Sequence, residues 1–179
     1  MRAGRATFAD VLRNFGALAG VGDLDQDGYA DFAASAPAYD IDFEHYDTGL
    51  VHVWYGAASG PAQDPAWTVY GNQSEERFGC SVSAAGDIDG NQYIDILIGA
   101  KGYNNGTGKV GGAYLFSNTG GVTGLTPSWF DSGPDMYSSF GTSVAGLGDL
   151  NNDGYADVGV GAPYCHKEIE GCVFVYCGV

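Results

Sequence analysis

Asp23-Leu-Asp-Gln-Asp-Gly-Tyr-Ala-Asp31 is the stretch that decides the fold, because two close copies of it follow along the chain. The copies are Asp87-Ile-Asp-Gly-Asn-Gln-Tyr-Ile-Asp95 and Asp149-Leu-Asn-Asn-Asp-Gly-Tyr-Ala-Asp157. The first residues of the three stretches lie 64 and 62 positions apart. Near-constant spacing indicates an internal repeat, so the 179 residues are interpreted as three copies of one unit.

Two further motifs repeat in step with the acidic stretch. A Phe-Gly pair precedes each stretch, and a segment related to Gly-Ala-Pro follows it. The pairs are Phe15-Gly16, Phe78-Gly79 and Phe140-Gly141. The following segments are Ala34–Pro37, Ile98–Lys101 and Val160–Pro163. Three motifs in a fixed order are not expected to recur by accident.

The composition excludes several classes of protein. Acidic residues number 22 against 7 Lys and Arg, which gives a formal net charge of −15. With 45% hydrophobic residues the chain is nevertheless too apolar for an acidic disordered segment. Nucleic acid and anionic membranes would be repelled by such a charge. No apolar run approaches the ~20 residues of a membrane span, so we expect no membrane insertion.

Each unit is predicted to consist of short strands separated by Gly, Asp and Asn turns. No window shows a sustained helical period, which makes the chain all-β. The predicted strands are Phe15–Gly20, Tyr29–Ser35, Leu50–Tyr55 and Trp67–Tyr70; Phe78–Ala84, Tyr93–Ile98, Ala113–Phe116 and Trp129–Phe130; and Phe140–Leu147, Tyr155–Val160 and Cys172–Cys177.

Both faces of these strands are largely apolar. In the third predicted strand, Val51 and Val53 point to one face, and His52 and Trp54 point to the other. Strands of this kind are buried on both sides, so small sheets must stack face to face. Repeated four-stranded sheets that stack in this way are the blades of a β-propeller. A β-sandwich remains the alternative, although it does not require a repeated unit.

Phe-Gly, an acidic loop and Gly-Ala-Pro, in this order, resemble the FG-GAP repeat. This repeat forms the blades of the integrin α-subunit propeller and of many bacterial surface and secreted proteins. The resemblance covers nearly the whole chain. It implies a β-propeller in which each acidic loop joins the first and second strands of a blade and binds Ca²⁺.

The chemistry of the loops agrees with that implication. Ca²⁺ takes six to eight oxygen ligands, and each loop offers carboxylate, amide or carbonyl oxygens at its positions 1, 3, 5, 7 and 9. The candidate ligands are Asp23, Asp25, Asp27, Asp31 and the carbonyl of Tyr29 in the first loop; Asp87, Asp89, Asn91, Asp95 and the carbonyl of Tyr93 in the second; and Asp149, Asn151, Asp153, Asp157 and the carbonyl of Tyr155 in the third. Up to three Ca²⁺ ions are therefore expected.

The second loop departs from the pattern. Gly28 and Gly154 occupy position 6 of the outer loops and allow a sharp turn, whereas the second loop has Gly90 at position 4 and Gln92 at position 6. Either this turn closes differently or Gln92 adopts a costly positive φ. We expect the second site to be the weakest.

Two alternative structures for the loops fit the residues less well. An EF-hand needs flanking helices and a bidentate Glu at position 12, where this chain has the apolar residues Ala34, Ile98 and Val160. Solvated Asx turns would also use Asp and Asn. Turn formation, however, does not require three or four facing carboxylates in three loops.

The repeat defines one domain over residues 1–179. Its parts are an N-terminal segment 1–14, blade 1 at 15–77, blade 2 at 78–139 and blade 3 at 140–179. Blade 3 lacks a fourth strand, which the N-terminal segment, with Ala6–Ala9 as a short strand, could supply to a last blade. Propellers have about four to eight blades, so we expect a homodimer that closes a six-bladed ring. The alternative is a piece of a longer protein.

The remaining reactive side chains give no sign of catalysis. Cys165 and Cys172 flank a short turn between predicted strands and are candidates for a disulfide, which suits an oxidising compartment. His45, His52 and His166 lie at unrelated places in their units, without a triad-like set of partners. No catalytic residue is predicted, and an enzyme is not expected.

The expected function is a calcium-binding propeller for protein or glycan binding, as in adhesion, with the metal in a structural role. Its expected place is extracellular, periplasmic or at the cell surface. The partner itself is not identified by the sequence. The alternatives are the propeller part of a secreted hydrolase or lyase acting on carbohydrate or lipid, and a fragment of a longer adhesin without its own activity.

Overall fold

The computed structural model describes residues 14–121, 126–165 and 170–179. These residues form an all-β structure of eleven strands. The strands are β1 (Leu18–Gly22), β2 (Asp31–Ala36), β3 (Leu50–Trp54), β4 (Trp67–Tyr70), β5 (Phe78–Gly86), β6 (Asp95–Ala100), β7 (Gly112–Phe116), β8 (Trp129–Ser132), β9 (Ser143–Gly148), β10 (Asp157–Cys165) and β11 (Glu170–Tyr176).

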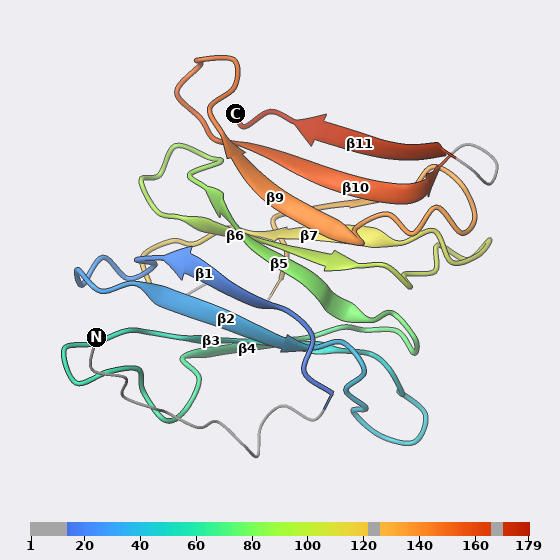
Figure 1. Cartoon of the computed structure of the whole chain (residues 1–179), viewed down its shortest axis with the longest axis horizontal. Coiled ribbons are helices and arrows are strands. Elements are labelled where there is room, and N and C mark those ends of the chain that lie inside the picture. The colour runs from blue at the N-terminus through green and yellow to red at the C-terminus, as the bar shows by residue number, and fades with distance from the viewer. Residues whose placement is uncertain (1–13, 122–125, 166–169) are drawn as a thin grey trace.

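The strands make three antiparallel sheets, one for each repeat unit. Two sheets have four strands, in the orders β1-β2-β3-β4 and β5-β6-β7-β8, and the third contains β9, β10 and β11. Figure 1 shows the three sheets stacked one above another. The strand that residues 1–14 are predicted to add lies outside the described residues. Stacked antiparallel sheets that each follow one repeat fit a β-propeller.

Two first strands begin later than the sequence predicts. β1 begins at Leu18 rather than at Phe15, and β9 begins at Ser143 rather than at Phe140. The Phe140 N–H donates to the carbonyl of Val110 in the neighbouring blade (3.0 Å), so it does not enter the ladder of its own sheet. Phe140 therefore contacts the neighbouring blade before its own strand starts.

The second strands also begin later than predicted. Each starts at the last Asp of an acidic loop, two residues beyond the predicted start at Tyr29, Tyr93 and Tyr155. The N–H group of each Tyr donates to the side chain at position 5 of its loop. These tyrosines therefore belong to the acidic loops and not to the sheets.

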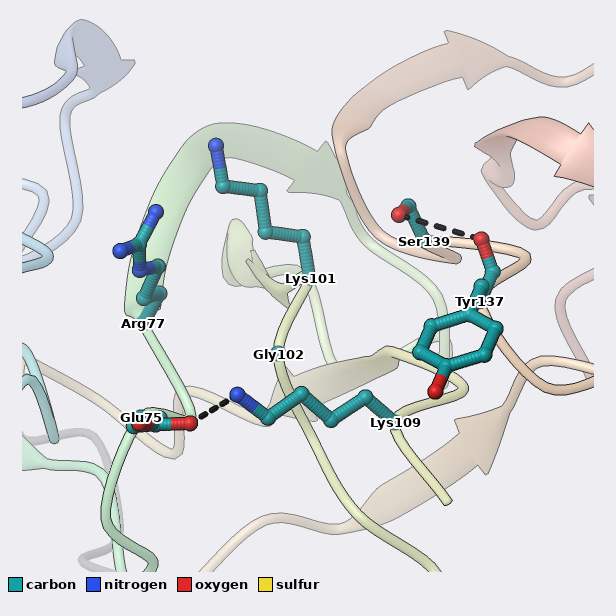
Figure 2. A pocket seen from close by; sticks show the side chains of 7 residues that line it. All are labelled: Glu75, Arg77, Lys101, Gly102, Lys109, Tyr137 and Ser139. Carbon is teal, nitrogen blue, oxygen red and sulfur yellow. Dashed lines mark hydrogen bonds and ion pairs between the residues drawn. The ribbon is translucent and has the colours of Figure 1, made fainter.

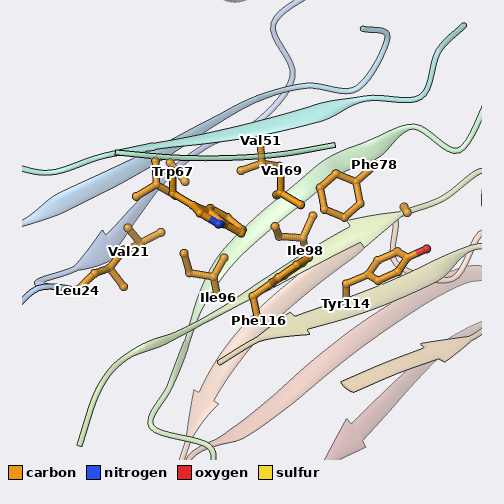
Figure 3. Close-up of a cluster of buried hydrophobic side chains, with 13 residues drawn as sticks. Val21, Leu24, Val51, Trp67, Val69, Phe78, Ile96, Ile98, Tyr114 and Phe116 are labelled. Carbon is orange, nitrogen blue, oxygen red and sulfur yellow. The ribbon is translucent and has the colours of Figure 1, made fainter. Parts of the chain in front are cut away.

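Apolar side chains fill the space between blades 1 and 2. Val51 and Val53 of β3 point into it, together with Ile96 and Ile98 of β6 (Figure 3). The indole of Trp67 meets the ring of Phe116 edge to face, with 5.2 Å between centroids. The opposite face of β3 is buried as well, as the apolar pattern on both faces predicts.

Two of the Phe-Gly pairs, Phe78-Gly79 and Phe140-Gly141, hold neighbouring blades together. Phe78 and Phe140 are 2% and 1% exposed, whereas Phe15 is 55% exposed. Gly141 has a φ of 80°. A Cβ there would lie 2.0 Å from the carbonyl oxygen of Gly112 in the preceding blade. Glycine is required here for both conformation and contact.

One face of the third sheet is open among the described residues. Val173 and Val175 of β11 are 75% and 51% exposed, and they pair with Gly161 and Gly159 of β10. The other face, with Val158 and Val160, is buried against blade 2. The described ranges also contain no helix that is long and apolar enough to cross a membrane.

Candidate metal centres

The three acidic loops lie at the same end of the blades. They connect β1 to β2, β5 to β6 and β9 to β10, at the left of Figure 1. Each loop thus joins the first and second strands of its blade, as the family resemblance implies. The repeat therefore places three sets of oxygen-bearing side chains in equivalent positions.

The first Asp of each loop closes the turn with both of its carboxylate oxygens. Asp23 accepts the N–H groups of Asp27 (3.1 Å) and Gly28 (2.9 Å). The same pair of bonds joins Asp87 to Asn91 and Gln92 (2.9 and 2.8 Å), and Asp149 to Asp153 and Gly154 (3.1 and 2.9 Å). The repeated bonds show that the three loops share one backbone conformation.

Positions 4 and 6 of every loop have a positive φ. The values are 60° and 92° at Gln26 and Gly28, 74° and 74° at Gly90 and Gln92, and 60° and 97° at Asn152 and Gly154. The second loop therefore closes in the same way as the others, and Gln92 does adopt the unfavourable conformation. Because each loop contains one non-glycine residue with positive φ, this strain does not single out the second loop.

The last Asp of each loop is a buried brace. Asp95 is fully buried, and its two carboxylate oxygens accept the N–H groups of Ile88 (3.1 Å) and Asn118 (2.8 Å). Asp31 does the same for Leu24 and Gly56, and Asp157 for Leu150 and Gly178. The loop pattern predicts these residues as ligands only. Their position directly before an apolar strand was the signal for a structural role.

Burial changes the ionisation of these braces. The pKa of Asp95 is raised to about 6, chiefly by burial and to a smaller extent by the nearby Asp89 and Asp87 carboxylates. Burial also raises the pKa of Asp31. The pKa of Asp157 is lowered instead, chiefly by the N–H of Leu150. A bound cation would favour the ionised form in every loop.

The structure brings carboxylates together in two of the loops. Oxygens of Asp23, Asp25 and Asp27, and of Asp87, Asp89 and Asp95, lie within 4.8 Å of one another. In the third loop Asn151 separates Asp149 from Asp153, and its amide donates to Asp153 (2.7 Å). Ligands on opposite sides of a Ca²⁺ ion are about 5 Å apart, so the first two sets match the size of one ion.

Other predicted site residues lie away from the loops. Cys165 and Cys172 are joined in a disulfide with a Cα–Cα distance of 5.8 Å. His45 Nδ1 lies 2.8 Å from a carboxylate oxygen of Asp42. His166 lies outside the described residues.

Comparison with known proteins agrees with this geometry. A family model described as the FG-GAP repeat matches residues 15–54 and 140–164. Integrin alpha-IIb of Mus musculus is 37% identical over 120 residues, which is 64% of this chain and 12% of the relative. Integrin alpha-5 of Xenopus laevis is 31% identical over 169 residues, or 92% of this chain and 15% of the relative. Integrin alpha-V of Gallus gallus is 30% identical over 165 residues, or 88% and 15%. The chain thus spans about an eighth to a seventh of the length of these relatives.

Proposed function

Because the chain belongs to the FG-GAP repeat family of integrin α-like propellers, we propose that it is a Ca²⁺-loaded propeller module for binding a protein or glycan, as in adhesion. Its proposed place is outside the cell or at the cell surface. The observation that carries the proposal is the threefold repetition of an oxygen-only loop with one backbone conformation.

The proposed metal has a structural role. In the first loop the carboxylates of Asp23, Asp25 and Asp27 lie close together. These negative charges repel one another unless a cation lies between them. None of the ion pairs among the described residues involves a loop carboxylate. Ca²⁺ would neutralise the loop and connect the end of β1 to the start of β2. Extracellular Ca²⁺ modules have Kd values of about 10⁻⁴–10⁻³ M, which suits this location.

Calorimetric titration of the metal-free chain with Ca²⁺ tests the metal proposal. We expect up to three ions per chain; because every loop contains one non-glycine residue with positive φ, the strain at Gln92 gives no reason to rank the second site below the others. Asp25→Asn and Asp89→Asn should each weaken one site and leave the others, because each removes one carboxylate of one loop. Absence of Ca²⁺ binding at millimolar concentration would contradict the proposal.

The open face of blade 3 supports a ring that closes through a second copy of the chain. In blade 2, a Cβ at Gly99 would lie 1.9 Å from the Gly141 carbonyl oxygen of blade 3. The backbone of blade 3 therefore packs directly against this glycine. Gly161 is the equivalent residue of blade 3, and the nearest atom to its Cβ position is Ser143 Oγ of the same sheet. Gly161 thus leaves room on blade 3 for the backbone of a further blade to pack in the same way.

Light scattering tests this closure. We expect a mass of twice the 18.6 kDa of one chain. Val175→Asp should produce the monomer, because it places a charge on the open face. A matched Thr107→Asp change, in an exposed turn of blade 2, should leave the dimer intact. A monomer at every concentration would contradict the dimer.

A screen of protein and glycan arrays tests the binding role. The chain is applied with Ca²⁺ and again with excess chelator. We expect binding that requires Ca²⁺, because the loops hold the blades in their binding conformation. Binding of equal strength in chelator would contradict the coupling of metal and function.

A further inference from the structure

A cationic pocket lies outside the metal loops. Arg77, Lys101 and Lys109 line one pocket of about 340 Å³, together with Glu75, Tyr137 and Ser139 (Figure 2). They are all the Lys and Arg residues within the described ranges. In a chain of net charge −15, such gathering is not expected from chance placement on the surface.

The cations come from segments that are distant in sequence. Arg77 directly precedes β5, and Lys101 and Lys109 follow β6, while Tyr137 and Ser139 precede β9. The pocket therefore spans blades 2 and 3 at the end opposite the acidic loops. The fold, and not a local cluster in the sequence, brings the positive charges together.

The charge in the pocket is only partly neutralised. Lys109 pairs with Glu75, and Arg77 pairs with Asp47 at 3.2 Å. The Lys101 ammonium forms no ion pair with any side chain of the described ranges. One cation is thus available for an anionic ligand.

The pocket wall has a fixed backbone. Four of its residues have a positive φ, namely Glu75 (61°), Arg77 (55°), Tyr137 (67°) and Ser139 (53°). Such conformations persist only where the surrounding structure holds them. Gly102 lies so close to the preceding turn that a Cβ would be 2.0 Å from the Glu75 carbonyl oxygen. The cations therefore project from a wall that is ordered before a ligand arrives.

We propose that this pocket binds a single carboxylate of a protein partner, with Lys101 as its ion-pairing residue and Arg77 beside it. A polyanionic glycan would meet the repulsion of the whole acidic chain, whereas one carboxylate on a neutral peptide meets mainly the local cations. The exposed ring of Tyr137 offers an apolar contact at the rim. This inference rests on the proposed binding function and names the chemistry that it would use.

Amide NMR spectra of the full chain in saturating Ca²⁺ test the proposal. The probe is N-acetyl-aspartate N-methylamide, and its neutral control is the corresponding asparagine compound. We expect the aspartate probe alone to shift the amide signals of Lys101, Gly102 and Ser139. Lys101→Met should weaken binding roughly fivefold, the upper range for an exposed ion pair. Arg77→Gln should weaken it less, because Asp47 already pairs with Arg77.

Gln63→Glu is the matched control. It changes the net charge by the same single unit at an exposed site in the β3–β4 connection, at the other end of the blade. It should leave the affinity for the aspartate probe unchanged. Equal loss of affinity in this variant would show a response to net charge alone and would overturn the assignment to Lys101.

Two further outcomes would overturn the proposal. One is an equal response to the asparagine probe, and the other is tighter binding of a sulfated heparin disaccharide, which would assign the pocket to glycans. Signals of the acidic loops report Ca²⁺ binding in the same samples. Loss of those signals alone would affect the proposed metal role, and loss of the pocket response alone would affect only this inference.

Discussion

At each end of the blades the backbone conformation repeats from one blade to the next, but only at one end do the side chains repeat as well. At one end, Asp23, Asp87 and Asp149 make equivalent hydrogen bonds in three loops. At the other end, the residue before each Phe-Gly pair has a φ of 53–60°, yet it is Asn14, Arg77 or Ser139. A side chain that repeats with the backbone serves every blade, whereas one that changes can serve a unique site. The acidic end is thus suited to structure and the cationic end to recognition.

Removal of Ca²⁺ should have the largest effect and should act through the acidic end alone. At 100 times Kd, one site contributes about 2.7 kcal/mol, so three sites would contribute roughly 8 kcal/mol. Excess chelator should lower the melting temperature by more than about 10 °C, since 1 kcal/mol corresponds to roughly 2–4 °C in a domain of this size. Lys101→Met should melt like the wild type in both conditions. A melting temperature that is unchanged by chelator would contradict the structural role of the acidic end, and with it the proposed difference between the two ends.

The buried brace and an exposed ligand of the same loop should differ in their dependence on Ca²⁺. Asp95→Asn replaces one of two oxygens that accept backbone N–H groups, which should cost about 2 kcal/mol even in chelator. Asp89→Asn should destabilise the chain only when Ca²⁺ is present. Denaturant unfolding with and without Ca²⁺ measures both. Equal behaviour of the two variants would show that position 9 is a ligand without a structural role of its own.

An exchange at position 6 should measure the backbone strain within the loops. Gln92→Gly should stabilise the metal-free chain by about 0.5–1 kcal/mol, because glycine accepts a φ of 74°. Gly28→Gln should destabilise it by a similar amount. A Cβ at Gly28 meets no atom within 4 Å, so conformation alone is tested there.

Chemical unfolding in chelator provides this measurement. Opposite signs for the two variants would confirm that the loops share one conformation in solution. A loss of stability in Gln92→Gly would show that the Gln92 side chain makes a contribution that outweighs its strain. Such a result would also separate the second loop from the others.

The acidic end could be predicted because its information is local and repeated. The spacing of Asp87, Asp89 and Asp95 predicts a loop, and the strands around it follow from apolar runs. The sequence also predicts that either the second loop closes differently or Gln92 adopts a positive φ. Only the structure shows that Gln92 adopts the positive φ. The bracing role of Asp95 depends on the N–H of Asn118, 23 residues away, and no periodic pattern indicates such a partner.

The cationic end could not be predicted, since it depends on packing between blades. Arg77, Lys101 and Lys109 are separated by 24 and 8 positions, and their spacing indicates no shared site. Tyr137 and Ser139 lie 62 positions after Glu75 and Arg77, at equivalent places in the next unit. Because the residue types differ between the units, a search for repeated motifs does not detect the pocket. A search of the sequence for departures from the repeat would have marked these positions but not their proximity.

One buried acid at the cationic end provides the smallest and most specific test. Glu76 is fully buried, and its carboxylate accepts the N–H groups of Asn72 (2.7 Å) and Gln73 (3.0 Å) and the hydroxyl of Tyr114 (2.5 Å). Burial raises its pKa above the usual value for Glu. The folded state therefore favours the protonated form, and the stability that this form contributes is lost as pH rises through the raised pKa.

Glu76→Gln should consequently change stability by less than about 1 kcal/mol near pH 4, since the amide oxygen can accept both N–H groups and the Tyr114 hydroxyl can accept from the amide. As pH rises above 4.5, the wild type should lose stability relative to this variant, because only the wild type must ionise a buried carboxyl group. Denaturant unfolding from pH 4 to 7 in saturating Ca²⁺ measures the difference, and the effects of the acidic loops cancel between the two proteins. A difference that is constant over this range would show that the Glu76 carboxylate is fully compensated by its three donors. The ionised Glu76 would then be stabilised by its hydrogen-bond donors as the carboxylates of the metal loops are. Acidic residues at the two ends of the blades would no longer differ in how burial affects their ionisation.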